Sequence, residues 1–207
     1  MTSNHTSRMA ALLGRLRREM NGAVVEAMEQ AGVKGVLNYG VSIPTIRAIA
    51  EGEEPDYDFA KFLYRQEVRE LRMAAVTIAD PEQLVAKELE FWLEFNPTLE
   101  LLDELAQRLL SRASHEIRVL IVEQWLRSER EVAVYTALRV ATRSNDIELN
   151  MIHSSVSDAL SRFADSMDVA RAALALYTMR LSGEELPTLP QTAAAEFLIR
   201  EYNALFF

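Results

Sequence analysis

The stretch that decides the fold is EVRELRMAA, residues 67–75, when it is compared with HEIRVLI, residues 115–121. In both stretches a Glu-x-Arg pair opens an apolar segment. The pairs are Glu70–Arg72 and Glu116–Arg118, 46 residues apart. A weaker echo, ELNMI, follows at residues 148–152. This spacing predicts a structural unit that recurs along the chain.

Helical periodicity fills the space between these pairs. In the first segment, Met9, Leu12, Leu13, Leu16 and Met20 recur at intervals of three and four residues, which is typical of an amphipathic helix. Predicted helices also include residues 41–51, entered through a loop at Gly40, and 82–95, which follows Asp80-Pro81. Later ones are predicted at 98–112, 115–128, 130–143, 147–164, 167–181 and 191–205. Strand-like alternation does not persist anywhere.

Two-helix units of roughly 40 to 47 residues are the signature of HEAT and armadillo repeats. Short connections predict that successive helices lie antiparallel. We therefore predict an all-α, HEAT-like helical-repeat solenoid of about ten helices, forming a single domain over residues 1–207. The alternative is an irregular helical bundle without a repeat.

Composition limits the function. The chain lacks cysteine, so thiolate metal sites and disulfides are excluded. It has neither a long apolar run nor a recognisable secretory signal, so we expect a cytoplasmic protein. Its net charge of −9 argues against an indiscriminate nucleic-acid binder. The charge is uneven, however: +3 over residues 1–47, −8 over 48–112 and −4 over 113–207.

Residues 39–50, YGVSIPTIRAIA, followed by the helical segments around Leu63-Tyr64 and Glu70-x-Arg72, resemble the DNA alkylation repair family. These proteins are HEAT-like alkylpurine DNA glycosylases of the AlkD type. Much of the matching motif has a structural interpretation. Gly40 permits a turn with positive φ, Pro44 suits the first turn of a helix, and Arg47 can tie helices together.

The resemblance implies a candidate catalytic residue, Asp103, which falls on the family's aspartate in the stretch 97–106. In the family this carboxylate stabilises positive charge on the sugar while an alkylated base departs, without a metal or organic cofactor. Leu99 stands where the family has an aromatic residue, and residues 144–162 contain no Phe, Trp or Tyr. A family arginine is expected near 134–138, where this chain has Tyr135. The alternative for Asp103 is a structural acid beside Glu104.

The resemblance also implies duplex DNA as a partner, contacted through its phosphates. Arginine side chains suit phosphate, and the candidate contacts are Arg15, Arg18, Arg47, Arg72 and Arg118. The alternative for Arg15 and Arg18 is a solvated helix face. The alternative for Arg72 and Arg118 is a bond to acids or carbonyl groups of a neighbouring repeat. Trp92 and Trp125 lie in apolar helical contexts that favour the core over base stacking.

Two hypotheses for the function follow. In the first, the chain is a diverged DNA alkylation repair protein that binds DNA and has weak or absent alkylpurine DNA glycosylase activity. In the second, it is a non-catalytic scaffold that binds a protein partner on its concave surface.

Overall fold

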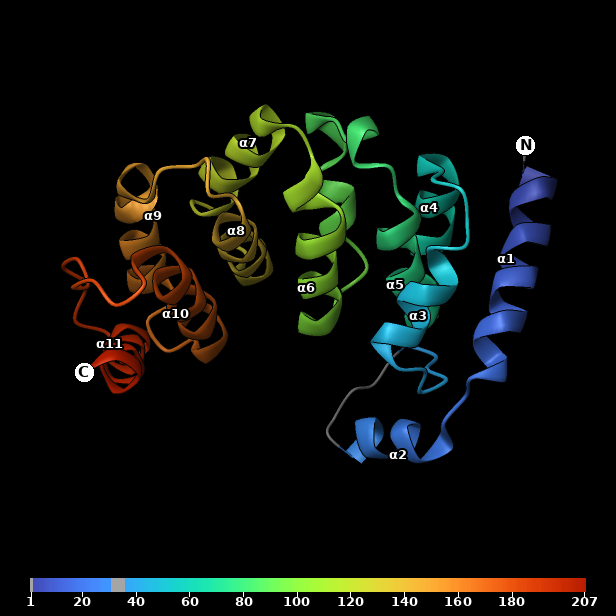
Figure 1. Cartoon of the computed structure of the whole chain (residues 1–207), viewed down its shortest axis with the longest axis horizontal. Coiled ribbons are helices and arrows are strands. Elements are labelled where there is room, and N and C mark those ends of the chain that lie inside the picture. The colour runs from blue at the N-terminus through green and yellow to red at the C-terminus, as the bar shows by residue number, and fades with distance from the viewer. Residues whose placement is uncertain (1, 31–35) are drawn as a thin grey trace. The chain divides into compact units, whose positions relative to one another are not determined.

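The computed structural model describes residues 2–30 and 36–207 (Figure 1). Within these ranges the chain forms eleven α-helices and four short 3-10 helices. The described residues contain no strand, only one isolated parallel bridge between Leu37 and Val68. The prediction of an all-α helical-repeat fold is confirmed. None of the described helices combines the length and apolarity that a membrane crossing requires.

The chain divides into two compact units, residues 1–83 and 84–207. The first unit contains α1 (Thr2–Arg18), α2 (Gly22–Gln30), α3 (Ile43–Ala50), α4 (Tyr57–Tyr64), α5 (Arg69–Ile78) and η1 (Pro81–Gln83). The second unit contains η2 (Ala86–Glu88), η3 (Glu90–Leu93), α6 (Leu99–Arg108), η4 (Leu110–Arg112), α7 (His115–Trp125), α8 (Glu131–Arg143), α9 (Leu149–Arg162), α10 (Met167–Leu181) and α11 (Ala193–Phe206). The expectation of a single domain remains a prediction.

The loop before α3 is held by a buried carboxylate. Glu70 of α5 is fully buried, and its Oε1 accepts hydrogen bonds from the backbone N–H groups of Tyr39 (3.1 Å) and Val41 (3.3 Å). Between them, Gly40 has a φ of +71°. Ser42 then caps α3 by accepting from the N–H of Thr45, and a proline occupies the first turn. The positive φ of Gly40 and the place of Pro44 in the first turn of the helix are as the sequence predicted.

The repeated arginine of the Glu-x-Arg pairs has a repeated structural role. Arg72 Nε donates to the carbonyl oxygen of Gln66 at 2.8 Å, and Arg118 Nε donates to that of Ala113 at 3.1 Å. Each bond satisfies a carbonyl group in the connection that precedes the arginine's own helix. A buried or half-buried carbonyl group without a partner is costly. The 46-residue spacing in the sequence therefore reflects the same local closure made twice.

The prediction of one helix over residues 82–95 is wrong, because this segment forms η1, η2 and η3 instead. The side chain of Asp80 accepts a hydrogen bond from the N–H of Glu82, a local turn that competes with a helical start. Val85 is extended, which lets Leu84, Leu89 and Trp92 all be buried. Packing of these apolar residues overrides the helical propensity of the segment.

The second unit is built in two layers (Figure 1). Helices α6, α8 and α10 pack side by side and form one layer. Helices α7 and α9 form the second layer, in which α7 packs against α8 and α9 packs against α10. Val134 and Leu138 of α8 and Leu176 of α10 are fully buried. Trp92 and Trp125 are also buried, as the sequence predicted, and Trp125 Nε1 donates to Glu90 at 3.1 Å.

Candidate nucleic-acid interface

Asp103 lies on α6 and faces two side chains of α8. Thr98 caps α6 by accepting from the N–H of Leu101, and this start places Leu102 and Leu105 in the core while Asp103 stays partly exposed. On α8, Tyr135 and Arg139 are four residues apart and therefore share a helix face. Tyr135 Oη donates to Asp103 Oδ1 at 3.0 Å, and Arg139 Nε donates to the same oxygen at 2.6 Å.

Burial and neighbouring charges shift the pKa values of Tyr135 and Arg143 in this cluster. Burial, together with the charge of Asp103, raises the pKa of Tyr135 to about 12, so its hydroxyl keeps its proton and remains a donor at neutral pH. Burial, followed by the positive charge of Arg139, lowers the pKa of Arg143. Arg143 lies one turn beyond Arg139 and donates from Nη1 to the carbonyl oxygen of Arg139 at 3.1 Å. Two guanidinium groups therefore lie close together beside a single carboxylate.

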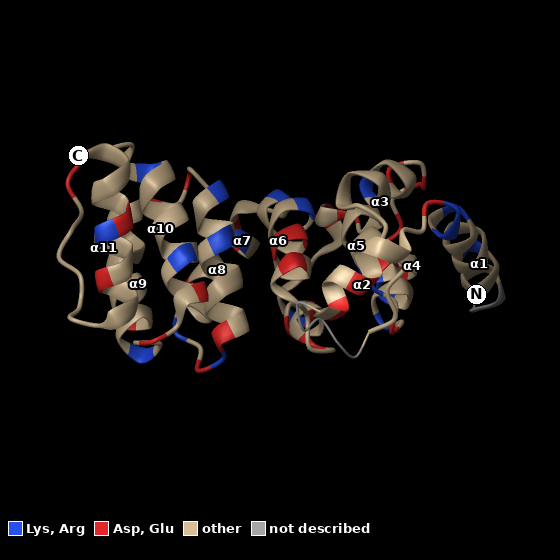
Figure 2. Ribbon diagram, turned by 90° about the horizontal axis from the view of Figure 1, so that it is seen from below, with Lys and Arg blue, Asp and Glu red and all other residues tan. Residues whose placement is uncertain are grey.

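The first turn of α10 extends the cluster. The carboxylate of Asp168 is close enough to Tyr135 to help raise that residue's pKa. Asp168 pairs with Arg171 at 3.5 Å, and the side chain of Arg171 is 64% exposed. Figure 2 shows basic segments on α8 and α10 and acidic segments on α6. Three guanidinium groups, those of Arg139, Arg143 and Arg171, thus accompany two aspartates on this face of the second unit.

Sequence reasoning missed these three arginines. The resemblance to the family predicted an arginine within residues 134–138, and Arg139 is one position outside that range. The signal that could have found them is the spacing Tyr135-x3-Arg139-x3-Arg143, which puts all three side chains on one face of α8. The sequence does not show that α6, which carries Asp103, packs against α8.

Arg118, a predicted phosphate contact, is committed to a different partner. Its Nη1 and Nη2 donate to the two carboxylate oxygens of Asp146 at 2.5 and 2.6 Å, and its side chain is only 15% exposed. His115 Nδ1 also lies 2.7 Å from Asp146. The Arg118 and His115 hydrogen bonds hold the pKa of Asp146 well below its usual range. These contacts favour the structural alternative for Arg118.

The other predicted contacts belong to the first unit. Arg15 pairs with Glu53, and Arg8 pairs with both Glu53 (3.5 Å) and Asp56 (2.5 Å). Arg18, at the end of α1, is exposed and makes no ion pair with any described residue. Arg47 is half-buried on α3. Arg72 is only 5% exposed, which leaves little of its surface for a phosphate. The four residues of the first unit lie on three different helices, α1, α3 and α5.

The aromatic walls that the resemblance implies are replaced by aliphatic or polar side chains. Leu99 opens α6 and is 40% exposed, and α9 carries no aromatic residue. Across the described residues, no three His, Asp or Glu side chains gather where a metal ion could be held. The chemistry available at this face is therefore that of two carboxylates, one phenol and guanidinium groups.

Comparison with known proteins also points to HEAT-like repeat proteins and to DNA alkylation repair. One solved structure, described as "a new family of proteins related to the HEAT-like repeat DNA glycosylases with affinity for branched DNA structures", is similar over 95% of this chain and 94% of that chain. The TM-score is 0.63 and the sequence identity is 15%, so this likeness shows the fold alone. Curated proteins give no significant match. The sequence model of a family described as "DNA alkylation repair enzyme" matches residues 12–167, and the chain therefore belongs to that family.

Proposed function

We propose that the protein binds DNA through the exposed face of α6, α8 and α10, and that it excises alkylated purines weakly or not at all. The observation that carries the proposal is the arginine group of α8 and α10. Arg139 and Arg143 lie side by side, and Arg171 adds a third guanidinium on the neighbouring helix α10, 6.0 Å from the ring of Phe197 on α11. A protein with a net charge of −9 needs such a local concentration of positive charge to attract a polyanion.

Guanidinium groups bind phosphate oxygens through two parallel hydrogen bonds. Arg171 is exposed, and its partner Asp168 is held at 3.5 Å, a loose ion pair that a phosphate can replace. Arg143 donates from Nη1 to the backbone carbonyl oxygen of Arg139 and keeps other donors on the same guanidinium. These contacts position a backbone without reading a base sequence. Binding should therefore depend on the shape of the DNA more than on its sequence.

The similar solved structure suggests which kind of DNA to test. It belongs to proteins with affinity for branched DNA structures, and its fold covers nearly the whole of this chain. A four-way junction presents phosphates from several strands within a short distance. We infer that a junction binds this chain at least as tightly as a linear duplex of equal length.

Fluorescence anisotropy with labelled duplex and junction DNA tests the proposal. We expect saturable binding at low ionic strength. The slope of log affinity against log salt should be about −0.9 for each neutralised phosphate, so roughly −2 for Arg143 and Arg171 together. Absence of binding at tens of micromolar protein would contradict the proposal and favour the alternative, a scaffold for a protein partner.

Catalysis should be weak for a geometric reason. Tyr135 and Arg139 both donate a hydrogen bond to the same oxygen of Asp103. The Arg139 guanidinium therefore already balances the negative charge that an oxocarbenium-like sugar would need. The exposed Leu99 and the non-aromatic α9 do not supply the flat surfaces that hold a cationic base. Electrostatic stabilisation of a transition state requires that its donors and charges be preorganised around the reacting atoms.

We expect little or no release of 7-methylguanine or 3-methyladenine from methylated duplex DNA. The assay compares the wild-type protein with Asp103→Asn, which keeps the size of the side chain and removes its charge. Excision by the wild type that Asp103→Asn abolishes would prove the inactivity prediction wrong and make Asp103 catalytic. Excision that Asp103→Asn leaves unchanged would contradict both the prediction and the role of Asp103.

A further inference from the structure

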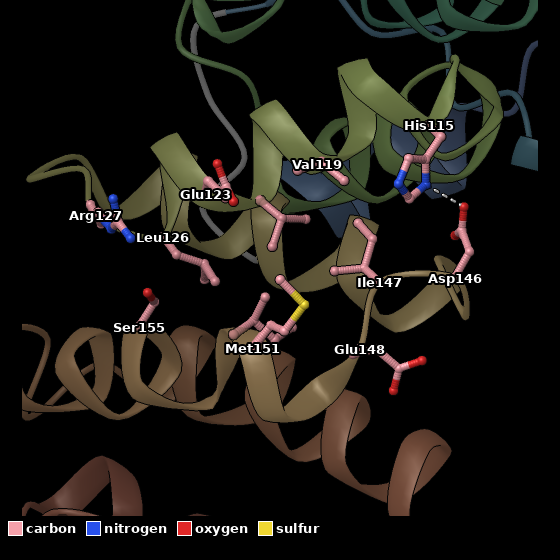
Figure 3. Close-up of a pocket in the computed structure, with 12 residues that line it drawn as sticks. His115, Val119, Glu123, Leu126, Arg127, Asp146, Ile147, Glu148, Met151 and Ser155 are labelled. Atoms are coloured by element: carbon pink, nitrogen blue, oxygen red, sulfur yellow. Dashed lines mark hydrogen bonds and ion pairs between the residues drawn. The ribbon is translucent and has the colours of Figure 1, made fainter.

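A cavity of about 230 Å³ opens between α7 and α9, in the layer of the second unit that does not carry the arginine group (Figure 3). Its floor is apolar. Val122 of α7 and Leu126, which follows α7, are fully buried, and Ile147 and Ile152 are 6% and 4% exposed. Six of the twelve lining residues are apolar and six are polar, so the cavity suits an apolar side chain that is flanked by polar groups.

Met151 stands at the mouth of this cavity. Figure 3 shows its side chain between α7 and α9, close to Ile147. It is 72% exposed, more than any other large apolar side chain of the described residues except Phe207. An unbranched thioether side chain adapts its shape to what it touches and is frequent on surfaces that bind peptides. A flexible apolar residue beside an open apolar cavity marks a surface for docking.

The rim charges define the chemistry of the occupant. Glu123 on α7 and Glu148 at the start of α9 are exposed rim residues, and neither forms an ion pair with another described residue. The nearby Asp146 is already paired with the Arg118 guanidinium and lies 2.7 Å from His115 Nδ1. Arg127 is the cation at the other end of the rim, next to Ser155 in Figure 3. Two carboxylates are thus available to basic groups of a ligand.

We propose that this cavity docks a helical segment of a protein partner that inserts one apolar side chain, flanked by lysine or arginine. The anchor would fill the space above Val122 and Ile152, and the basic residues would pair with Glu123 and Glu148. Interface anchors of this kind contribute most of the binding energy, and rim charges contribute specificity.

A polypeptide fits better than a metabolite or DNA. Small-molecule sites enclose roughly 300 to 1,000 Å³, more than this cavity offers. The two carboxylates repel phosphates, which excludes a nucleic-acid backbone. The arginine group lies in the row of α6, α8 and α10, so the docked segment and DNA would occupy different layers of the second unit.

The test uses the full chain with isotope-labelled methionine methyl groups and a synthetic helical peptide. The peptide has about 15 residues, long enough to form a helix, with a leucine flanked by lysines one turn away on each side. We expect a saturable shift of the Met151 methyl signal, which Met151→Leu identifies by its loss. Met179, on α10 and 66% exposed, is the matched internal control and should not shift.

Two comparisons decide the outcome. Replacing both Glu123 and Glu148 by glutamine should weaken binding by about tenfold, because two exposed ion pairs are lost. A peptide with alanine in place of the leucine should not bind. No shift of Met151 at millimolar peptide, equal affinity for a peptide with glutamates in place of the lysines, or unchanged affinity in the double variant would each overturn the proposal. A duplex DNA that shifts Met151 would overturn it as well.

Discussion

Gly40→Ala is expected to lower the free energy of unfolding by about 3 kcal/mol. A left-handed φ of +71° alone costs a residue with a Cβ roughly 1 to 2 kcal/mol. The added Cβ would also fall well inside contact distance of the carbonyl oxygen of Asn21. That oxygen cannot withdraw freely, because it accepts a hydrogen bond from the N–H of Val25. Tyr39 and Val41, on either side of the glycine, are held by Glu70.

Urea unfolding followed by circular dichroism measures this effect, with Gly14→Ala as the matched control. Gly14 lies within α1, and a Cβ added there meets nothing within 4 Å. The control should therefore stabilise the protein by roughly 0.5 to 1 kcal/mol, because alanine is a better helix former than glycine. Both tryptophans lie in the second unit, so their fluorescence reports that unit separately. A Gly40→Ala transition equal to that of the wild type would contradict the prediction.

The helical repeat could be read from the sequence because its signals are local. Apolar spacing, the proline in the first turn of α3, and the recurring Glu-x-Arg pair each act within one or two turns. The helix predicted over residues 82–95 is absent for a non-local reason. Its helical pattern gave way to the burial of Leu84, Leu89 and Trp92, which depends on what surrounds them.

The candidate site was predictable only in part, for the same physical reason. Asp103 was found because a family motif places an acid there. Its partners on α8 lie 32 and 36 residues away in sequence, and only the packing of α6 against α8 brings them into contact. Arg118 was predicted as a phosphate contact because nothing in the sequence shows that Asp146 occupies its guanidinium. Arginine identity alone does not reveal which arginines are already paired.

The distinction between paired and available arginines leads to the second large effect. Arg171→Glu and Arg143→Gln should each weaken DNA binding by about tenfold, and together by about a hundredfold. A charge-assisted hydrogen bond contributes roughly 1.5 to 3 kcal/mol, and 1.4 kcal/mol corresponds to a tenfold change in affinity. The salt slope should become shallower by about one for each lost phosphate contact. Anisotropy titrations at fixed low salt measure both quantities.

The matched control is Arg127→Glu. Arg127 is exposed and follows α7, in the layer away from the arginine group. Its substitution changes the net charge of the protein by the same amount as Arg171→Glu. If long-range attraction by total charge governed binding, the two reversals would weaken it equally. If the face of α8 and α10 holds the phosphates, Arg127→Glu should change the affinity by less than about twofold, because an exposed charge in another layer is screened within roughly 10 Å at 0.1 M salt. Equal losses in the two variants would therefore refute the placement of the DNA, while leaving DNA binding itself intact.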